Sequence, residues 1–534
     1  MNKGLTRAFV SVRWPAPLLT LLLFCSVVGQ TAVPTLTDPT LQVTMVVSGL
    51  SQPTGLAFLG PDDFLVIEKA SGQVKHVVGG VVTAIVLDLP VNSNSERGLL
   101  GMALHPDFPA NPSVYLYWTE SSTGADSTVV TEVGNPASLF PPGTPAPLGN
   151  RVDRFTWNPA AQTLTYAQNL IRLHAYQHDS NNPASSNPLA AFQANHNCGK
   201  LVFGPDRKLY IMIGDNGRRG WLQNLPNGAF LPPAPDDEFG GPAPDDNHVT
   251  GSIFRLNDDG TSPADNPFFA AGAALGGEVG ANLQKLNSYG HRNGFGLAFD
   301  PLSGNLWDSE NGDDSFDEIN KIVPGGNYGW VQVMGPVSRI AQFKMIEMNL
   351  FTPPAMLGTL QQIRYPTTRI AYTPALALAR MFPLPGATYQ DPEMSWRYSV
   401  SPAGLGFVKG DSLGPAYNGT LWSGSATPTD VTGGSRGTFA GGYLMMFKLT
   451  ADRAHLDLSA DPRLADRVAD NGTYPPPVGT SAGAAGFKYD GRESESLLIG
   501  QNFGVTTDIQ TGPDGNLYVV SNTHNVIYKI SRVP

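Results

Sequence analysis

Cysteine is scarce in this chain of 534 residues, which has only Cys25 and Cys198. Cys25 falls in an N-terminal segment that we expect to be removed, so Cys198 would be the only cysteine of the mature protein. An intrachain disulfide is then excluded. Stability must come from packing and from any bound metal.

Charged residues are also few, at 15% of the chain, and the formal net charge is -11. No basic run of useful length is present, which argues against a nucleic-acid surface. Glycine and proline are abundant instead, with 59 and 46 residues. Because both weaken helix interiors, the composition favours many short strands joined by turns.

Long hydrophobic runs are missing as well. The most apolar segment, residues 16–28, is about thirteen residues long, whereas a bilayer-spanning helix needs ~20. Lys3, Arg7 and Arg13 precede it and small residues follow it, as in a secretory signal peptide. We therefore expect a signal peptide over residues 1–32, a single domain over residues 33–534, a periplasmic or extracellular location and no stable membrane insertion. A retained membrane anchor is the alternative.

One phrase recurs along the chain: an apolar strand, a Pro/Asp/Gly turn, then a second strand that usually carries Leu-Tyr or Leu-Trp. Its copies cover residues 56–66, 102–117, 201–210, 297–307, 405–422 and 512–520. Two short apolar strands reversed by a turn predict a β-hairpin. The first two copies lie about 46 residues apart, close to the ~40–50 residues of a four-stranded blade. We predict an all-β, closed β-propeller without a long helix. The alternative is a multi-sheet sandwich built from similar hairpins.

Three Pro/Gly-rich stretches interrupt this pattern, at residues 121–149, 221–246 and 335–391. They predict long surface loops, and in a propeller such loops gather on one face and shape a pocket there.

Three segments carry more polar residues than a blade needs. They are residues 95–102, 195–200 and 289–293, and the third continues after its hairpin through residues 310–330. Each stands at the edge of a predicted strand, where the loops of a propeller meet its central channel. These segments form the candidate site.

Residues 96–108, 195–215, 248–268 and 289–330 strongly resemble the soluble PQQ-dependent glucose dehydrogenase and aldose sugar dehydrogenase family (glucose/sorbosone dehydrogenases). The resemblance covers most of the chain after about residue 45 and is weak in the inserted loops and after residue 335. It implies a six-bladed propeller, with the quinone cofactor PQQ and calcium on its axis. The implied reaction oxidises a small-molecule sugar, an aldose, at C1 and passes the electrons to an external acceptor.

The resemblance implies a role for each of several residues. His196 matches the catalytic base, and a neutral imidazole can take the hydroxyl proton while hydride leaves the same carbon. Arg292 matches a cation that stabilises the charge developing on the reduced quinone. Asn293 and Glu96 would also contact the cofactor, although the glucose enzymes have an amide at the position of Glu96. Asn195 would contact the substrate.

The same resemblance places calcium on the backbone carbonyls of Gly312 and Asp313, since hard oxygen ligands suit that ion. It also matches Trp396, more loosely, to an aromatic residue that packs on the sugar. Other interpretations stay open from the residues alone. His196 could cap a strand end, and Arg292 could pair with Glu310 or Asp317. The acidic residues 310–318 could form a solvated turn or a calcium site that only braces the loop, and Cys198 could be a packing residue.

The cations that hold the cofactor's carboxylates in the family have no counterpart here. This chain has Ala440 and Gly441 at one position and residues 505–507, Val-Thr-Thr, at the other. A tricarboxylate in a partly dry channel needs positive charge, which hydroxyl groups do not supply. Arg436 or Lys409 would have to reach in from a neighbouring loop.

Three functions follow as hypotheses. The first is a quinone-dependent sugar dehydrogenase with His196 as its base. The second is a non-catalytic propeller that binds carbohydrate or a protein. The third is a calcium-dependent, lactonase-like hydrolase, in which one metal and one histidine activate water.

Overall fold

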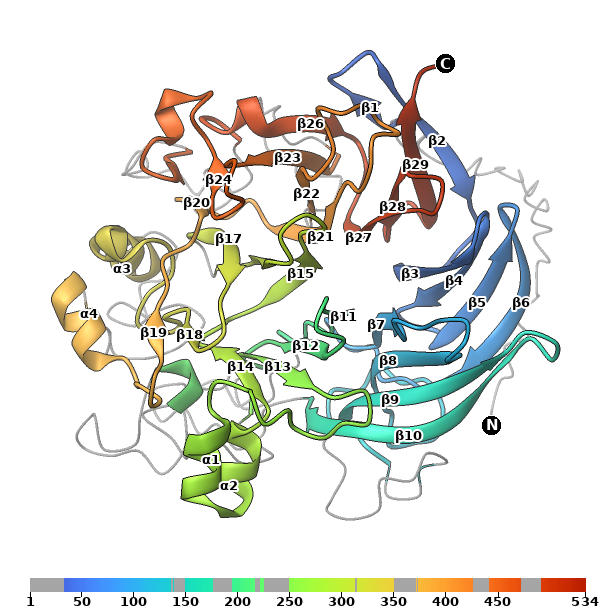
Figure 1. Cartoon of the computed structure of the whole chain (residues 1–534), viewed down its shortest axis with the longest axis horizontal. Coiled ribbons are helices and arrows are strands. Elements are labelled where there is room, and N and C mark those ends of the chain that lie inside the picture. Colours follow the sequence, from blue (N-terminus) through green and yellow to red (C-terminus); the bar gives the residue numbers. More distant parts are fainter. Residues whose placement is uncertain are drawn as a thin grey trace, which may run out of the picture. The chain divides into compact units, whose positions relative to one another are not determined.

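The computed structural model describes residues 33–135, 138, 149–175, 195–216, 221–224, 249–312, 315–349, 371, 373–425, 441–471 and 491–534. Within residues 33–534, the described strands form six sheets that follow one another around a common axis (Figure 1). The fold is therefore a mainly β protein of the β-propeller class, as the sequence predicts, and the sandwich alternative is wrong.

Each sheet starts at the axis with a hairpin. The six hairpins are β3 (Pro53–Gly60) with β4 (Asp63–Glu68), β7 (Leu99–Leu104) with β8 (Ser113–Thr119), β11 (Leu201–Phe203) with β12 (Leu209–Ile213), β15 (Gly294–Phe299) with β16 (Leu306–Glu310), β21 (Pro402–Phe407) with β22 (Leu421–Ser425), and β27 (Thr506–Thr511) with β28 (Leu517–Ser521). They coincide with the six repeats of the sequence, so all six predicted hairpins are confirmed. The inner strands contact one another in chain order, and β27 contacts β3, which closes the ring.

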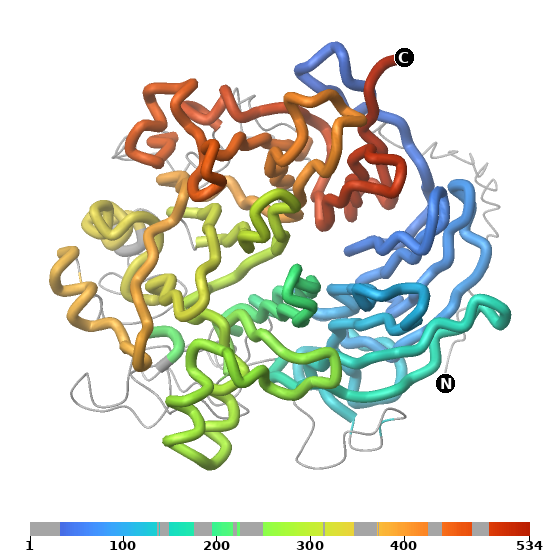
Figure 2. The backbone as a smooth tube through the Cα atoms, viewed as in Figure 1, coloured from blue at the N-terminus to red at the C-terminus, as the bar shows by residue number. Residues whose placement is uncertain are grey.

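The remaining strands extend each sheet outward. In sheet order they are β5 (Gln73–Val78) and β6 (Val81–Asp88); β9 (Gly149–Asn158) and β10 (Thr163–His174); β13 (Ser252–Leu256), β14 (Leu286–Tyr289), β18 (Gly326–Asn327) and β19 (Thr388–Tyr389); β17 (Asp317–Ile322), β20 (Met394–Trp396) and β25 (Val468–Ala469); β23 (Tyr443–Leu449), β26 (Leu498–Gln501), β1 (Thr35–Leu36) and β24 (Leu456–Asp457); and β29 (Val526–Arg532) with β2 (Leu41–Val47). The last sheet joins the two ends of the described chain, because β2 pairs antiparallel with β29 (Figure 2).

The hydrophobic core lies between neighbouring sheets. In β8, Leu116 and Trp118 pack in the cluster shared with the β3–β6 sheet, whereas Tyr115 and Tyr117 pack in the cluster shared with the β11–β14 sheet. Successive residues of a strand point to opposite faces. Because both faces of this sheet are covered, β8 is apolar along nearly its whole length.

Helices lie at the periphery (Figure 1). The described α-helices are α1 (Phe269–Leu275), α2 (Gly277–Leu283), α3 (Ile340–Asn349) and α4 (Pro374–Arg380), and the 3-10 turns are η2 (Trp221–Gln223), η4 (Val337–Arg339), η8 (Pro462–Leu464) and η10 (Glu495–Leu497). The expectation that residues 335–391 are a plain loop is wrong, since α3, α4 and β19 fall inside them. Ile340 and Phe343 of α3 are buried against Trp330, so this insertion has an apolar core. The predicted loops 121–149 and 221–246 lie in large part outside the described residues. Among the described residues, no helix is both long and apolar enough to cross a lipid bilayer.

A buried ion-pair network in the second sheet yields a test of this packing. Arg151 of β9 donates from Nη1 to Glu120 at 2.9 Å and from Nε to Asp153 at 2.7 Å. Arg151→Met leaves both carboxylates buried without their counter-charge, so we expect a loss of about 3–5 kcal/mol in the free energy of unfolding. Urea denaturation measures it. Arg154→Met, on the same strand at a partly exposed position, is the control, and an equal loss in both variants would contradict the network's role.

Candidate functional site

The six inner strands run in the same direction along the axis, so the residues at their starts meet at one end of the channel. A cavity of about 170 Å³ at this end is lined by one residue at, or just before, the start of each inner strand: Thr54, Leu100, Lys200, Phe295, Ala403 and Thr507. The second strand of each hairpin is antiparallel, so the residues that follow it return to the same end. The three polar segments precede β7, β11 and β15 or follow β16, and the fold therefore brings them together.

His196 lies just before β11 and is held by a buried carboxylate. Its Nδ1 lies 2.6 Å from Oδ1 of Asp215, which follows β12. Oδ2 of Asp215 accepts a hydrogen bond from the indole of Trp330 at 2.7 Å. The backbone of His196 has φ 59°, a conformation that residues other than glycine and asparagine adopt rarely. Because Asp215 occupies Nδ1, the nitrogen that can exchange a proton with a ligand is Nε2.

Glu96 links His196 to the next blade. Its Oε2 accepts from the backbone N–H of His196 at 2.6 Å and from the side-chain amide of Asn293 at 3.3 Å. Asn195 contacts Ser95, next to Glu96, through a short hydrogen bond of 2.5 Å. The structure thus places three predicted site residues, Glu96, Asn293 and Asn195, around the backbone of His196.

Arg292 is buried beside the same group. Its guanidinium donates from Nη1 to the carbonyls of Asn311 at 2.9 Å and Gly312 at 2.5 Å. It lies 5.4 Å from the centre of the Trp330 ring, a cation–π distance. Glu310 accepts from the backbone N–H of Arg292, and Asp317 accepts from that of Gly312 at 2.7 Å. The acidic residues around Arg292 therefore fix the backbone of its loop.

Gly214 allows the His196 and Arg292 segments to approach each other. A Cβ at this position would lie 2.4 Å from the carbonyl oxygen of His196 and 2.7 Å from that of Arg292. Both distances are far below van der Waals contact, so only glycine fits between the two segments. The backbone N–H of the following residue, Asp215, donates to the carbonyl of Arg292 at 2.8 Å.

The predicted calcium ligands are only partly placed. The carbonyl oxygen of Gly312 lies in the site, where it accepts from Arg292. Asp313 and Asp314 lie outside the described residues.

Trp396 lies elsewhere. It belongs to β20, its side chain is 0% exposed, and its indole N–H donates to Ser494 at 3.1 Å. It packs in the apolar cluster between two sheets, with Phe407 and Phe447. A fully buried ring offers no face to a sugar, so the structure corrects the predicted sugar contact of Trp396 to a core role. The sequence alone does not distinguish a tryptophan at a strand end that packs in the core from one that contacts a sugar.

Val505 and Thr507, at the positions where the family resemblance expects cations, line the same cavity as Glu96. Ala440 and Arg436 lie outside the described residues. Lys409 follows the far end of β21 and lines a second cavity of about 490 Å³ that runs along the channel. Since a strand rises ~3.3 Å per residue, Lys409 lies roughly 20 Å from the end of β21 that carries the site.

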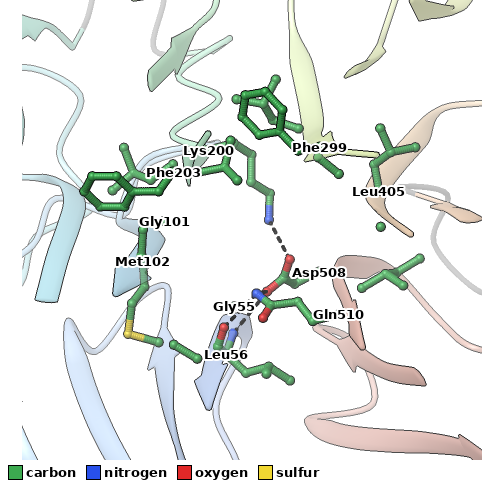
Figure 3. Close-up of a pocket in the computed structure, with 18 of the residues that line it drawn as sticks. Gly55, Leu56, Gly101, Met102, Lys200, Phe203, Phe299, Leu405, Asp508 and Gln510 are labelled. Atoms are coloured by element: carbon green, nitrogen blue, oxygen red, sulfur yellow. Dashed lines mark hydrogen bonds and ion pairs between the residues drawn. The ribbon is translucent and has the colours of Figure 1, made fainter. Parts of the chain in front are cut away.

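Two other lysines reach the site cavity instead. Lys69, after β4, and Lys200, before β11, both line it. Burial lowers the pKa of Lys69, and the charge of Glu96 opposes that shift. Lys200 extends across the axis toward Asp508, with 3.7 Å between the ammonium and the carboxylate, and donates to the carbonyl of Thr507 at 2.5 Å (Figure 3). Positive charge is present, but each lysine is accompanied by a carboxylate.

Cys198 is a buried neighbour of the site. Its sulfur accepts from the backbone N–H of Gly294 at 3.1 Å, and burial raises the pKa of its thiol well above the ordinary value. A thiol with a raised pKa is a poor nucleophile, which agrees with the packing interpretation.

Sequence reasoning assigned no functional role to Asp215 or Lys69, and it interpreted Trp330 as blade core. Asp215 carried a usable signal, because Gly214-Asp215-Asn216 follows a buried strand and so returns to the end of the channel that carries His196. Lys69 carried none, since a lysine after a strand is ordinary in any blade.

Comparisons with known proteins relate this chain to one family in sequence and in fold. Residues 50–137 and 185–338 match the sequence model of the family described as Glucose / Sorbosone dehydrogenase. Quinoprotein glucose dehydrogenase B of Acinetobacter calcoaceticus is 33% identical over 299 residues, which are 54% of this chain and 52% of that protein. The chain thus matches about half the length of this relative.

Two solved structures have a similar fold. The soluble aldose sugar dehydrogenase of Escherichia coli, in its apo-form, is 20% identical, with 92% of this chain and all of the other covered and a TM-score of 0.53. The PQQ-bound aldose sugar dehydrogenase of Streptomyces coelicolor is also 20% identical, covers 92% of this chain and 98% of its own, and has a TM-score of 0.50. At such identities these structures support the fold alone.

The corrected role of Trp396 can be tested by stability. Trp396→Phe removes buried volume and leaves the hydroxyl of Ser494 without its donor, so we expect a loss of about 1–3 kcal/mol in the free energy of unfolding. Urea denaturation followed by circular dichroism measures it. An unchanged midpoint would show that the indole does not pack in the core, and would return Trp396 to the list of ligand-contact residues.

Proposed function

This chain belongs to the glucose/sorbosone dehydrogenase family, and from that premise we propose that it oxidises the C1 hydroxyl of an aldose with PQQ and calcium. The observation that carries the proposal is the His196–Asp215 pair at the mouth of the channel. A base that removes a hydroxyl proton must be held in a fixed orientation and face the substrate through one nitrogen. His196 meets these requirements because Asp215 holds its Nδ1 and Trp330 fixes Asp215 from the other side.

The donor set around His196 suits a planar, anionic cofactor. Arg292 supplies a buried guanidinium and Asn293 an amide, while Lys69 and Lys200 bring ammonium groups to the cavity that Val505 and Thr507 line. These four side chains would hold the cofactor. A calcium ion would be held by the carbonyl oxygen of Gly312, a hard ligand of the kind this ion prefers, and its charge would add to that of the lysines.

When bound, PQQ supplies an electron-poor carbonyl that accepts a hydride. His196 takes the hydroxyl proton at Nε2, and the hydride leaves C1 of the sugar, so the aldose loses two electrons and two hydrogens and becomes a lactone. Asp215 stabilises the charge that His196 gains. Arg292 stabilises negative charge that develops on oxygen near it. The two electrons pass on to an external acceptor.

Two finer points belong to the same proposal. We take each of the six sheets as one blade, which gives a six-bladed propeller. We also propose that residues 1–32 direct export, so that the enzyme meets its sugar and its electron acceptor outside the cytoplasm.

One observation favours a second candidate, a propeller that binds carbohydrate without catalysis. Lys69 is accompanied by Glu96 and Lys200 by Asp508, so the described cavity lining has little excess positive charge for a tricarboxylate. A neutral sugar does not need that charge.

The role of His196 is tested with His196→Gln. Without the imidazole we expect kcat for aldose oxidation, measured by reduction of an artificial electron-accepting dye with PQQ and calcium present, to fall about 10²–10⁴-fold. PQQ affinity, measured by calorimetry, should change little, because the cofactor's charge meets other residues. His455→Gln, at a half-exposed position on another blade, is the control. Activity retained within a factor of three would exclude His196 as the base.

Glu96→Gln separates the two candidate functions. Glutamine still offers an oxygen to the His196 N–H, but it frees the charge of Lys69 for the cofactor. Because the substitution removes the repulsion between the Glu96 carboxylate and the carboxylates of PQQ, PQQ should bind about tenfold more tightly in calorimetry. Glu278→Gln on the peripheral helix α2 should change nothing. Failure of both the native protein and Glu96→Gln to bind PQQ with calcium, together with binding of sugars, would support the non-catalytic candidate.

A further inference from the structure

A polar cluster lies on the blade beside the site and takes no part in the proposed oxidation. Asp308 and Glu310 alternate on β16 and so point to the same face. The antiparallel register with β17 places Asn320 opposite Asp308 and Glu318 opposite Glu310. Cross-strand partners share a face, so one face of this hairpin carries three carboxylates and an amide. All four side chains are at most 2% exposed.

His291 completes the cluster. Its Nδ1 lies 3.0 Å from Oε2 of Glu310 and 3.6 Å from Oδ2 of Asp308, and the three ligand atoms lie within 4.8 Å of one another. Nε2 is bonded to the hydroxyl of Ser288 at 2.9 Å, and the ring stacks on Tyr328 at 4.6 Å. When Nε2 carries the proton and donates it to Ser288, the lone pair of Nδ1 faces the two carboxylates.

Within the part of the chain that the structure describes, three oxygens of the cluster accept no hydrogen bond of ordinary geometry. Neither oxygen of Asp308 accepts a hydrogen bond of ordinary geometry from the described residues, and the same holds for Oδ1 of Asn320. Asp308 is 0% exposed. A buried acceptor without a donor costs about 1–3 kcal/mol, and more if it is charged. Three such oxygens at one place point to a missing cation.

We propose that His291, Asp308 and Glu310 bind one divalent metal ion of the zinc class. A dication balances the charge of the two ligand carboxylates, Asp308 and Glu310, in a region that solvent does not reach. Ligand atoms 3.0 and 3.6 Å apart fit a tetrahedral ion with bonds of about 2.0 Å. An imidazole nitrogen with two carboxylates suits zinc, whereas calcium takes oxygen ligands alone. This site is separate from the calcium expected at Gly312.

The ion would brace the candidate site. Glu310 binds the ion through Oε2, while its Oε1 accepts from the backbone N–H of Arg292. The next residues, Asn311 and Gly312, supply the carbonyls that hold the Arg292 guanidinium. Metal binding at Glu310 would therefore fix the backbone of Arg292 and also the carbonyls that accept from its guanidinium. The inference does not depend on the proposed oxidation, because metal content can be measured without a substrate.

The test is the metal content of the native chain produced in zinc-supplemented medium and dialysed against a chelator. Because the cluster is closed to solvent, the ion should survive dialysis and be released on unfolding in guanidinium, where a colorimetric indicator detects it. We expect about one zinc per chain in the native protein and in Asp300→Asn, and less than about 0.2 in Asp308→Asn. Asp300 is the matched control, a buried aspartate that pairs with Arg453 and follows β15 in the same sheet.

X-ray absorption at the zinc edge of the native protein adds a readout that does not require a variant to fold. One imidazole nitrogen and oxygen donors at about 2.0 Å support the proposal. A native protein without a transition metal would overturn it, as would zinc that persists in Asp308→Asn, a sulfur ligand, or calcium as the only bound ion. In a metal-free cluster, protons would replace the ion, since burial and then the charge of Glu310 raise the pKa of Asp308 well above its ordinary value.

Discussion

All six inner strands run the same way along the axis, and the positions of His196 and of the candidate side chains around it follow from this constraint. Residues that precede β7, β11 and β15 meet at one mouth of the channel, although about a hundred residues separate each from the next. The contact between β27 and β3 completes the ring. Glu96 reaches both His196 and Asn293 because the three neighbouring sheets that begin with β7, β11 and β15 converge at the axis. The site is therefore a property of several neighbouring sheets and of no single one.

Close backbone contacts then set the site's precision. Gly214 lets the His196 and Arg292 segments touch. Asp215 then binds the imidazole of His196 through its carboxylate and the carbonyl of Arg292 through its backbone N–H. Glu96 fixes the backbone of His196 from the opposite side. Three blades thus hold one imidazole, and most of the energy for this order comes from the apolar layers between the sheets. A base held in this way loses little orientational freedom when a ligand arrives.

The sequence predicted the repeating part of the molecule well. Each inner hairpin is a local unit with its own turn signal, so residues 56–66 or 512–520 suffice to recognise one. His196 was recognisable because its polar phrase is one that a blade does not need. Trp396 was not, because burial is decided by residues such as Phe407 and Phe447 that lie on other strands. Lys69 was missed because a lysine after a strand is ordinary in any blade. The helices within residues 335–391 were missed because proline and glycine are frequent there and favour a loop.

The pairing of Leu41 with Arg532 has a consequence for how this protein reaches its fold. The two strands of this pair are separated by nearly the whole described chain, so they pair only after β29 has left the ribosome. Contacts of such long sequence separation slow folding, since loop-closure entropy is lost before they form. Until then β29, the outer strand of the last sheet, exposes an unpaired edge. The interval before closure is when the chain depends most on protection from aggregation.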